Sequence, residues 1–473
     1  MKRRFFMSLA GLAGVQMFQT SQASAKPGEI VEPARTIPVL DDCDICVVGG
    51  SCTGVFAAVR AARLGAKVVL IEKQNSFGGT ATNSLVNVWH SYKDEVFEKD
   101  ILAGLTLEVM DRLKKRGACK EYPRSGSRGF EFNSEELKIE LDELVAQAKI
   151  KPHLHAVFSQ PVVNDGELKA VIIENKSGRG AVKAKFFIDA TGDGDLCARL
   201  NIPSYVRSTL QPPTACARFD GWKSLHGINL NQLIAEHRGE FNLTEGFMWG
   251  SYVPNSDVYM LAGTRIYNVN CADAGDLTTA EIEGRRQIRA IQDIVRKYAP
   301  ESELALQALP SHIGLRETRH IRCHYQLKDD DVLHGRRFDD AVANGSYRVD
   351  VHHQDKPGIT LKYLDGRMDY IRPDAPVESG RWREKTEKNP TYYQIPFRSL
   401  IPQGPYGNVI IAGRMLDAEK EAFSAVRVMV NMNQTGEAAG VAASLALNAD
   451  QRIEQIDPCF LRSELEKGGS IVL

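Results

Sequence analysis

The residues with the clearest chemical meaning form a glycine-rich turn followed by an acidic residue. Gly49, Ser51 and Gly54 stand at the glycine positions of a G-x-G-x-x-G pattern, and Glu72 follows them. In that pattern, main-chain N–H groups and a helix N-terminus bind a pyrophosphate, while the carboxylate accepts hydrogen bonds from a ribose diol. Ser51 adds a side chain where the pyrophosphate comes closest, but serine is small enough to be tolerated. These residues predict a dinucleotide-binding site.

The segments around this turn have the order that such a site requires. Residues 45–48 are mostly β-branched and predict a strand, and residues 55–64 are rich in alanine and predict a helix. Gly65 is placed to end that helix, and residues 67–72 predict a second, parallel strand. We therefore expect a complete βαβ unit. The alternative is a glycine-rich turn in an ordinary α/β sheet.

Three further segments accompany this unit. Residues 77–82 look like an L-G-G-x-A-T turn, residues 187–195 contain A-T-G-D, and residues 408–414 end in A-G-R before a small-residue stretch at 431–440. With these segments the chain resembles the FAD-dependent oxidoreductases related to the flavin-containing component of heterodisulfide reductase, which have a glutathione-reductase-type FAD fold. The resemblance covers most of the chain and implies that the dinucleotide is FAD.

The turn and the resemblance together predict the residues that bind FAD. A helix beginning near residue 431 would point its free N–H groups at the pyrimidine edge of the flavin and stabilise the anionic reduced form, which favours flavin over nicotinamide. The alternative there is a buried alanine-rich helix behind a strand. The predicted cofactor-binding residues are Gly49, Ser51, Gly54, Glu72, Lys73, Gly78, Gly79, Thr80, Thr191, Gly192, Asp193, Gly413, Arg414, Thr435 and Gly436.

Some features of related proteins are missing from the sequence. No cysteine pair follows Gly78 and Gly79, and no second glycine-rich pattern follows for a nicotinamide cofactor. The nine cysteines are scattered, so neither a disulfide framework nor an iron–sulfur cluster is expected, and no spacing indicates a metal site. We expect Cys43 and Cys46 to lie on opposite faces of a strand. Dithiol chemistry is not expected. Since an exported protein meets no nicotinamide pool, we expect the electrons to leave through a quinone, a small carrier protein or oxygen.

The 473 residues exceed the size of one hydrophobic core. We expect an α/β architecture, a Rossmann-like three-layer FAD-binding domain with an inserted mixed α+β substrate domain. The FAD-binding parts are residues 40–203 and 396–450, the insertion is 204–395, and a C-terminal tail is 451–473. A helix at 135–144, capped by Asn133 or Ser134, and a β-excursion at 168–175 are expected as scaffold.

Candidate catalytic residues lie in the insertion and after the Gly78 turn. Residues 311–320 resemble the family's G-I-R-E-T-R motif, in which Arg316, then Arg319 and His320, would bind substrate or transfer a proton. An ion-pair network joining two domains is the alternative. His90 would approach the flavin as a base or attachment point, or pack in the core. Of the adjacent pair His352 and His353, at most one can face a site.

The N-terminus predicts export. Arg3 and Arg4 precede an apolar run that is shorter than the roughly 20 residues of a membrane-spanning helix, and Ala23-Ser24-Ala25 provides a cleavage pattern. Residues 1–25 are therefore expected to form a signal peptide resembling the twin-arginine type, which exports folded proteins. An ordinary secretory signal is the alternative. The mature protein is expected to be periplasmic or extracellular, with no membrane span.

The overall charge points to a small-molecule partner. The formal net charge is −1 and charged residues are spread through the chain, which favours neither nucleic acid nor an anionic membrane. We expect a dehydrogenase that transfers a hydride from a small polar organic substrate to flavin N5 and passes electrons to an unidentified external acceptor. The alternatives are a reductase using a low-potential donor and a non-catalytic flavin-binding sensor or assembly protein.

Overall fold

The computed structural model describes residues 28–124, 127–243, 248–373 and 375–473. Residues 39–473 form one compact unit, and residues 28–38 belong to a separate one. The expected signal peptide at 1–25 lies outside the described residues. None of the helices in the described ranges combines the length and apolar character needed to cross a bilayer.

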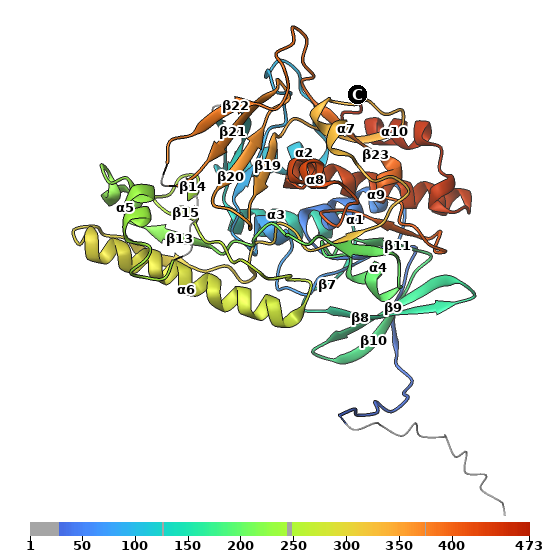
Figure 1. The fold of residues 1–473 in the computed structure, drawn as a ribbon. Coiled ribbons are helices and arrows are strands. Elements are labelled where there is room, and N and C mark those ends of the chain that lie inside the picture. The colour runs from blue at the N-terminus through green and yellow to red at the C-terminus, as the bar shows by residue number, and fades with distance from the viewer. Residues whose placement is uncertain (1–27, 125–126, 244–247, 374) are drawn as a thin grey trace, which may run out of the picture. The chain divides into compact units, whose positions relative to one another are not determined.

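A five-stranded parallel sheet lies at the centre of the unit (Figure 1). Side chains along each strand alternate between its two faces. Ile45 and Val47 join the core beneath the helices, whereas Cys46 and Val48 join a second core on the opposite face. In spatial order the strands are β24 (Val409–Ile411), β11 (Phe186–Asp189), β2 (Ile45–Val48), β3 (Val68–Ile71) and β7 (Lys151–His153).

Helices cover the first face of the sheet. The central pair is α1 (Cys52–Arg63) and α9 (Met429–Ala449), which approach closely because a Cβ on Gly436 or Gly440 would overlap a backbone oxygen of α1. A buried ion pair between Arg60 and Glu437 joins the two helices, and Glu437 also accepts a 3.1 Å hydrogen bond from the Leu105 N–H. The same layer contains α2 (Leu105–Lys115) and α3 (Ser134–Gln147). The Asn133 side chain caps α3, as expected.

A second sheet covers the other face. Its order is β1 (Val39–Asp42), β10 (Gly178–Lys183), β9 (Glu167–Asn175) and β8 (Val157–Asn164). Asp165 and Gly166 both have positive φ, of 52° and 77°, and form the two-residue turn between β8 and β9. This is the predicted β-excursion. Helices, parallel sheet and antiparallel sheet together confirm the Rossmann-like three-layer fold.

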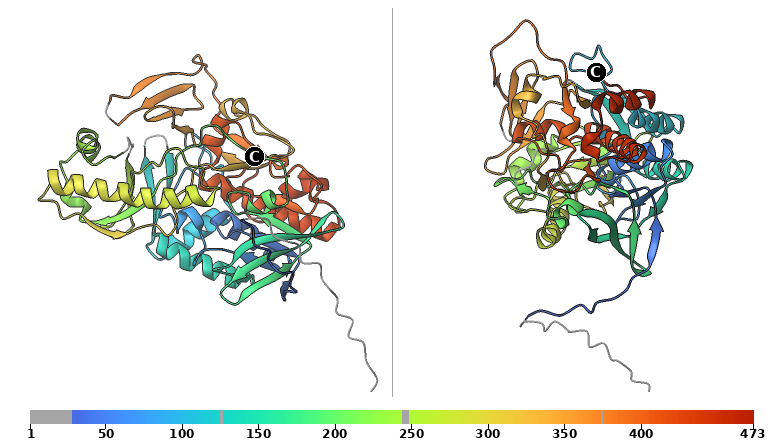
Figure 2. Two further views of the ribbon diagram at one scale, coloured as in Figure 1. Left: turned by 60° about the horizontal axis from the view of Figure 1, so that its bottom comes forward. Right: turned by 90° about the vertical axis from the view of Figure 1, so that its right-hand side faces the viewer.

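The segment between β11 and β24 supplies the inserted elements. These two strands are neighbours in the sheet although more than 200 residues separate them in the sequence. The long helix α6 (Ala274–Tyr298) runs along the outside of the unit beside the strands it covers (Figure 2). The expected domain boundaries at 204 and 395 stay predictions. The sheets of this segment are β14 (Trp249–Tyr252), β15 (Tyr259–Ala262), β13 (Cys216–Asp220) and β16 (Ala305–Ala308); β19 (Val349–His352), β20 (Ile359–Lys362), β21 (Arg367–Ile371) and β22 (Glu378–Arg381); and the pair β12 (Ser204–Val206) and β17 (Arg319–Ile321).

Shorter elements complete the unit. They are η1 (Gly79–Ala81), β4 (Val88–Trp89), β5 (Cys119–Arg124), β6 (Ser127–Phe132), α4 (Asp195–Arg199), η2 (Trp222–Leu225), α5 (Leu230–His237), α7 (Asp329–Leu333), β18 (Ala341–Gly345), β23 (Tyr393–Pro396), η3 (Phe397–Ser399), α8 (Lys420–Val426), η4 (Ile453–Gln455) and α10 (Pro458–Lys467). Helix α10 lies in the segment expected to be a tail. Its Leu461 and Leu465 are buried in the main core, so this segment is an integral part of the fold.

The cysteines are free thiols, and all except Cys459 are buried. The expectation for Cys43 and Cys46 was wrong, because both side chains lie in the core on the same face of the parallel sheet. The chain leaves β1 at Asp42 and enters β2 at Ile45, so the two cysteines do not lie on one continuous strand. Strand alternation therefore does not apply between them.

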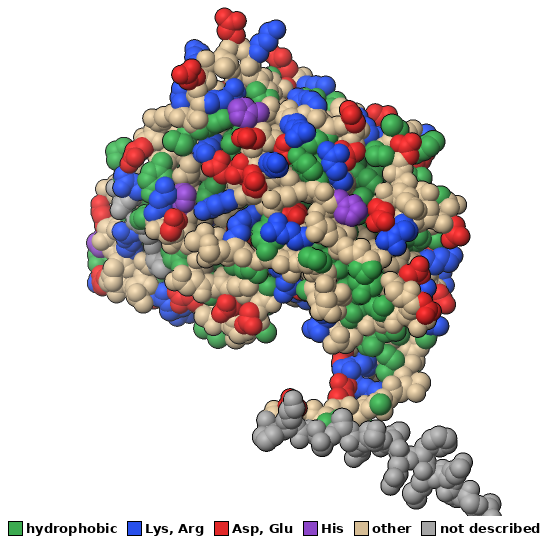
Figure 3. All heavy atoms as spheres, turned by 45° about the vertical axis from the view of Figure 1, so that its right-hand side comes forward, with side chains coloured by type: hydrophobic (Ala, Val, Ile, Leu, Met, Phe, Trp, Pro, Cys, Tyr) green, Lys and Arg blue, Asp and Glu red, His purple; other side chains and the backbone are tan. Residues whose placement is uncertain are grey.

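Charged side chains are mixed on the molecular surface. On the face drawn in Figure 3, Lys and Arg side chains lie among Asp and Glu side chains. The numbers of basic and acidic residues are also nearly equal, 59 and 60.

Candidate active site

A cavity of about 550 Å³ lies where the parallel sheet meets the inserted segment. One part of its lining, which we call the nucleotide wall, comes from residues 48–49, 51–53, 71–74, 78–80, 190–193, 195 and 413–414. Another part, the arginine wall, comes from Arg316, Tyr347, Arg348, Asp350, His352 and Arg427. Most of the predicted FAD-binding residues line the cavity: Gly49, Ser51, Glu72, Lys73, Gly78, Gly79, Thr80, Thr191, Gly192, Asp193, Gly413 and Arg414.

The glycine turn of the nucleotide wall connects β2 to α1. Gly49 has φ of 108°, and a Cβ there would overlap the carbonyl oxygen of Ala190. A Cβ on Gly54 would overlap the Gly49 oxygen, so glycine is required at both positions. Ser51, the departure from the glycine pattern, is the N-cap of α1, and its Oγ accepts a 3.4 Å hydrogen bond from the Gly54 N–H. The serine therefore stabilises the helix start that faces the cavity.

Glu72 follows β3 and lies on the nucleotide wall. Its Oε2 accepts a hydrogen bond from the Gly50 N–H, and its Oε1 accepts one from the Gln74 N–H, both at 2.7 Å. Burial raises the pKa of this carboxyl, while the two N–H groups oppose the shift. Each carboxylate oxygen has a further lone pair. The ribose contact expected of Glu72 stays a prediction that its position allows.

Three predicted cofactor residues do not line the cavity. Gly54 and Gly436 permit close backbone packing, and Thr435 Oγ1 accepts a 3.2 Å hydrogen bond from the Gly413 N–H and donates one of 2.6 Å to the Met432 carbonyl. These residues shape the wall from behind. Direct contact between them and a cofactor is not supported by their positions.

Unpartnered polar atoms on the lining fit a bound dinucleotide. Within the described residues, Arg414 Nε and Asn433 Oδ1 are buried without a hydrogen-bond partner. Asn433 lies in the first turns of α9, whose N-terminal residues Val428 and Met429 also line the cavity. Buried polar groups usually have partners, so these atoms suit a ligand that supplies donors and acceptors. The residues present fit FAD.

Arg316 and His90, two of the predicted catalytic residues, line the cavity. Arg316 donates through one terminal nitrogen to the Pro212 carbonyl at 2.6 Å and to Thr214 Oγ1 at 2.5 Å. Burial and the positive charges of Arg265 and Arg427 lower its pKa to about 9. The His90 ring packs against the Tyr347 ring, with the centroids 4.3 Å apart.

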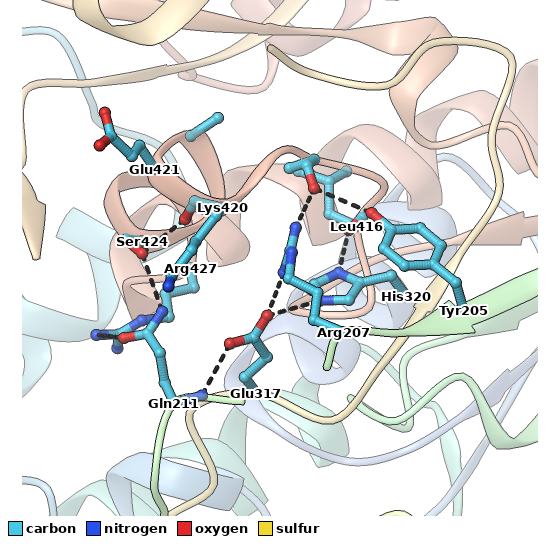
Figure 4. A network of polar contacts seen from close by, with 12 residues as sticks. Tyr205, Arg207, Gln211, Glu317, His320, Leu416, Lys420, Glu421, Ser424 and Arg427 are labelled. Carbon is cyan, nitrogen blue, oxygen red and sulfur yellow. Dashed lines mark hydrogen bonds and ion pairs between the residues drawn. The ribbon is translucent and has the colours of Figure 1, made fainter. Parts of the chain in front are cut away.

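Arg319 and His320 lie outside the cavity lining. His320 is fully buried: its Nδ1–H donates to the Leu416 carbonyl at 2.9 Å, and its Nε2 is 3.0 Å from Glu317 (Figure 4). Arg207 forms an ion pair with the same carboxylate. Arg319 donates to the Asp193 carbonyl at 3.0 Å. For these two residues the geometry fits the alternative interpretation, a polar network that joins segments of the fold.

Strand β19 and the residue before it supply cavity residues that were not among the predicted site residues. Arg348, Asp350 and His352 line the cavity, whereas Val349 and Val351 pack in the core. His353 does not line it, in agreement with the expectation that at most one of the adjacent histidines faces a site. The signal was present in the sequence as a period-2 alternation of charged residues and valine.

Asp350 and His352 form a buried pair. Arg265 donates to His352 Nδ1 at 2.7 Å, which leaves Nε2 as the protonated nitrogen, 3.2 Å from Asp350. Burial and the charge of Arg316 hold the pKa of His352 well below its usual range, so the ring is neutral. Burial raises the pKa of Asp350, but the hydrogen bond from His352 and the charges of Arg427 and Arg348 have the larger, opposite effect and hold the pKa well below its usual range, so the carboxylate is ionised.

His312 presents an acceptor atom on the lining. Its Nδ1–H donates to the Ile313 carbonyl at 2.8 Å, and among the described residues its buried Nε2 has no partner. Burial, together with the charge of Lys73, lowers the pKa of this imidazole from its ordinary value of 6.5. A neutral ring with a free Nε2 lone pair can accept a proton at neutral pH.

Comparison with curated proteins finds short matches to dihydrolipoyl dehydrogenases. The mitochondrial enzyme of Schizosaccharomyces pombe is 27% identical over 160 residues, which cover 32% of this chain and 28% of the relative. The enzyme of Trypanosoma brucei brucei is 37% identical over 107 residues, or 21% and 22% of the two chains. The matched region thus spans less than a third of either relative.

Comparison with solved structures finds long but distant matches. A geranylgeranyl bacteriochlorophyll reductase-like protein from Thermoplasma acidophilum is 10% identical with a TM-score of 0.44, covering 90% of this chain and 83% of its own. The p-nitrophenol 4-monooxygenase of Pseudomonas putida is 11% identical with a TM-score of 0.41, covering 91% and 84%.

A family model also matches most of the chain. The model of the FAD dependent oxidoreductases covers residues 44–465, which include the nucleotide wall, the inserted segment and most of α10. The match therefore extends over both the cofactor-binding and the inserted parts of the cavity lining. The chain belongs to the FAD-dependent oxidoreductase family, it is an oxidoreductase, and its cofactor is FAD.

Proposed function

We propose that the protein is a dehydrogenase that oxidises a small polar organic substrate and passes the electrons to an external acceptor. The observation that carries this proposal is the cavity itself, since the nucleotide wall and the arginine wall line the same space. Polar groups that converge on a pocket beside a cofactor site are typical of a substrate site. Bound FAD supplies a two-electron acceptor that takes the hydride from the substrate.

The chain's own part in this reaction is to hold the substrate and to remove a proton. Oxidation of an alcohol or amine carbon releases one hydride and one proton. We assign the proton to His312 Nε2, because its lone pair has no partner among the described residues and its lowered pKa keeps it available at neutral pH. The Nδ1–H bond to the Ile313 carbonyl fixes the tautomer that this role requires.

The proposal is tested by anaerobic reduction of the FAD-loaded enzyme with a panel of hydroxy acids, amino acids, polyols and sugars. We expect one class to bleach the flavin absorption, and we expect His312→Gln to slow bleaching roughly 100-fold, as for loss of a general base. His334→Gln is the matched control, because His334 lies outside the cavity lining. Reduction by a low-potential donor alone, followed by reoxidation by an organic compound, would instead identify a reductase. Binding without any redox change would identify a sensor.

We also propose that the protein is exported. The support is the sequence of residues 1–25, with Arg3 and Arg4 ahead of an apolar run. Fractionation and N-terminal sequencing should find a mature chain that begins after Ala25 in the periplasm or the medium. Replacing both arginines by lysine should abolish this exported chain. Cleavage that persists in the double variant would indicate an ordinary secretory signal, and an uncleaved cytoplasmic chain would contradict export. An exported enzyme meets no nicotinamide pool, so a quinone, a carrier protein or oxygen would reoxidise it.

A further inference from the structure

The two walls of the cavity differ in charge. The nucleotide wall contains Glu72, Asp193 and Asp195 beside Lys73 and Arg414, so acidic and basic side chains are mixed there. The arginine wall contains three arginines and one aspartate, Asp350. Because its histidine is held neutral, this wall carries an excess of positive charge.

Arg316 shows most clearly that the excess is not compensated by the protein. Its hydrogen bonds go to a carbonyl and a hydroxyl oxygen, and neither acceptor carries a charge. No carboxylate of the described chain lies within ion-pair distance of it. A guanidinium on a cavity wall without an anion is unfavourable, and a negatively charged ligand would remove that cost.

Arg427 extends the same surface toward the start of α9. Its terminal nitrogen donates to Gln211 Oε1 at 3.2 Å and to the Asp350 carbonyl at 3.3 Å, and it is 3.7 Å from the Asp350 carboxylate. Among the described residues its buried Nε has no partner. The Asp350 carboxylate is already shared, since the Tyr347 hydroxyl donates to it at 2.9 Å and His352 also contacts it. Arg427 therefore retains capacity for a second anion.

We propose that the substrate carries a carboxylate group, which Arg316 and Arg427 bind. A carboxylate matches the planar, two-donor edge of a guanidinium in both charge and geometry. The apolar Trp249, Ile359 and Leu361, which also line the cavity, suit the carbon skeleton of an organic acid. The inference rests on the proposed dehydrogenase function and names its substrate class.

The test measures binding without turnover. FAD-loaded enzyme is titrated anaerobically with acetate, propionate and succinate, with their amides, and with inorganic phosphate at constant ionic strength, and the flavin spectrum reports occupancy. We expect carboxylates to bind and the amides not to bind. Arg316→Met should weaken carboxylate binding roughly 10- to 100-fold, as for loss of a charge-assisted hydrogen bond, and Arg316→Lys should recover part of it.

Arg319→Met is the matched control, because Arg319 belongs to the same motif but lies outside the cavity lining; its affinity for carboxylates should equal that of the unmodified enzyme. Amides binding as tightly as acids, phosphate binding in preference to carboxylates, or full affinity in Arg316→Met would overturn the proposal. Arginine-dependent binding of acids with no acid able to reduce the flavin would support this inference and contradict the dehydrogenase function. If a neutral polyol reduced the flavin, and at an unchanged rate in Arg316→Met, this result would contradict the inference and support the dehydrogenase function.

Discussion

The nucleotide wall and the arginine wall face the same cavity but are built in different ways. The nucleotide wall is built around short backbone turns, with the Gly49 turn, the Gly78–Gly79 turn and the start of α4 on the lining beside charged side chains such as Glu72 and Lys73. The arginine wall is made of side chains from separate segments, with Arg316 from a loop, Asp350 and His352 from β19, and Arg427 from the end of α8.

This difference explains why one wall is easier to recognise than the other. A backbone site requires glycine at fixed short spacings, because only glycine permits the close approach and the positive φ. A side-chain site requires only that the right groups arrive at one place, which imposes no spacing along the chain. Variants of the two walls should therefore fail differently.

The largest effect is expected from Gly49→Ala on the nucleotide wall. The added Cβ would overlap the Ala190 oxygen at a residue with φ of 108°, so affinity for FAD should fall on the order of 100-fold. FAD content after dialysis and a reconstitution titration measure it. Gly239→Ala is the control, since a Cβ there meets open space. Full retention of FAD by Gly49→Ala would show that the turn is not the binding element.

Glu437→Gln tests the support behind the nucleotide wall. It leaves Arg60 buried between α1 and α9 without a charged partner, and the free energy of unfolding should fall by about 3 kcal/mol. Urea denaturation measures the change. Glu464→Gln, which breaks the more exposed pair with Lys467, should cost less than about 1 kcal/mol. Equal effects of the two variants would contradict a structural role for the buried pair.

The pH dependence of flavin reduction tests the proton acceptor. Because burial lowers the pKa of His312 below 6.5, the neutral base persists into mildly acidic solution. The rate should stay constant as the pH falls to 6.5, and should decline about tenfold per pH unit only below the lowered pKa. Stopped-flow reduction at saturating substrate measures this profile. If the rate began to decline above pH 6.5, or if the same decline persisted in His312→Gln, the proton would have to go to another group.

The smallest effect on catalysis is expected from His320→Gln. Its network with Glu317 and Leu416 lies outside the cavity lining, so the rate of flavin reduction should change less than about twofold. The free energy of unfolding should fall by about 1–3 kcal/mol, because buried polar groups lose a partner. Single-turnover rates and urea denaturation separate the two effects. A large loss of rate at unchanged stability would restore His320 as a catalytic residue.

Much of the fold could be predicted from local sequence. The βαβ unit, the Asn133 cap of α3 and the Asp165–Gly166 hairpin follow from patterns a few residues long, and the structure has them in place. Helix α10 was missed, because its apolar Leu461 and Leu465 are few and gain their stability from the core beneath them. The prediction that Cys43 and Cys46 lie on opposite faces of one strand was wrong, because the spacing of two cysteines does not show that one strand ends and another begins between them.

The sequence by itself determined a dinucleotide site, since that site depends on glycines and a carboxylate at short, fixed separations, and the resemblance of three further segments implied that the dinucleotide is FAD. Tertiary structure alone decided which cationic residues line the cavity. Arg316 and Arg319 are three residues apart in one motif, yet only Arg316 lines the cavity, and Arg427 joins it from more than 100 residues away. Side-chain direction in an irregular segment depends on what packs against it, and that information is spread over the whole chain.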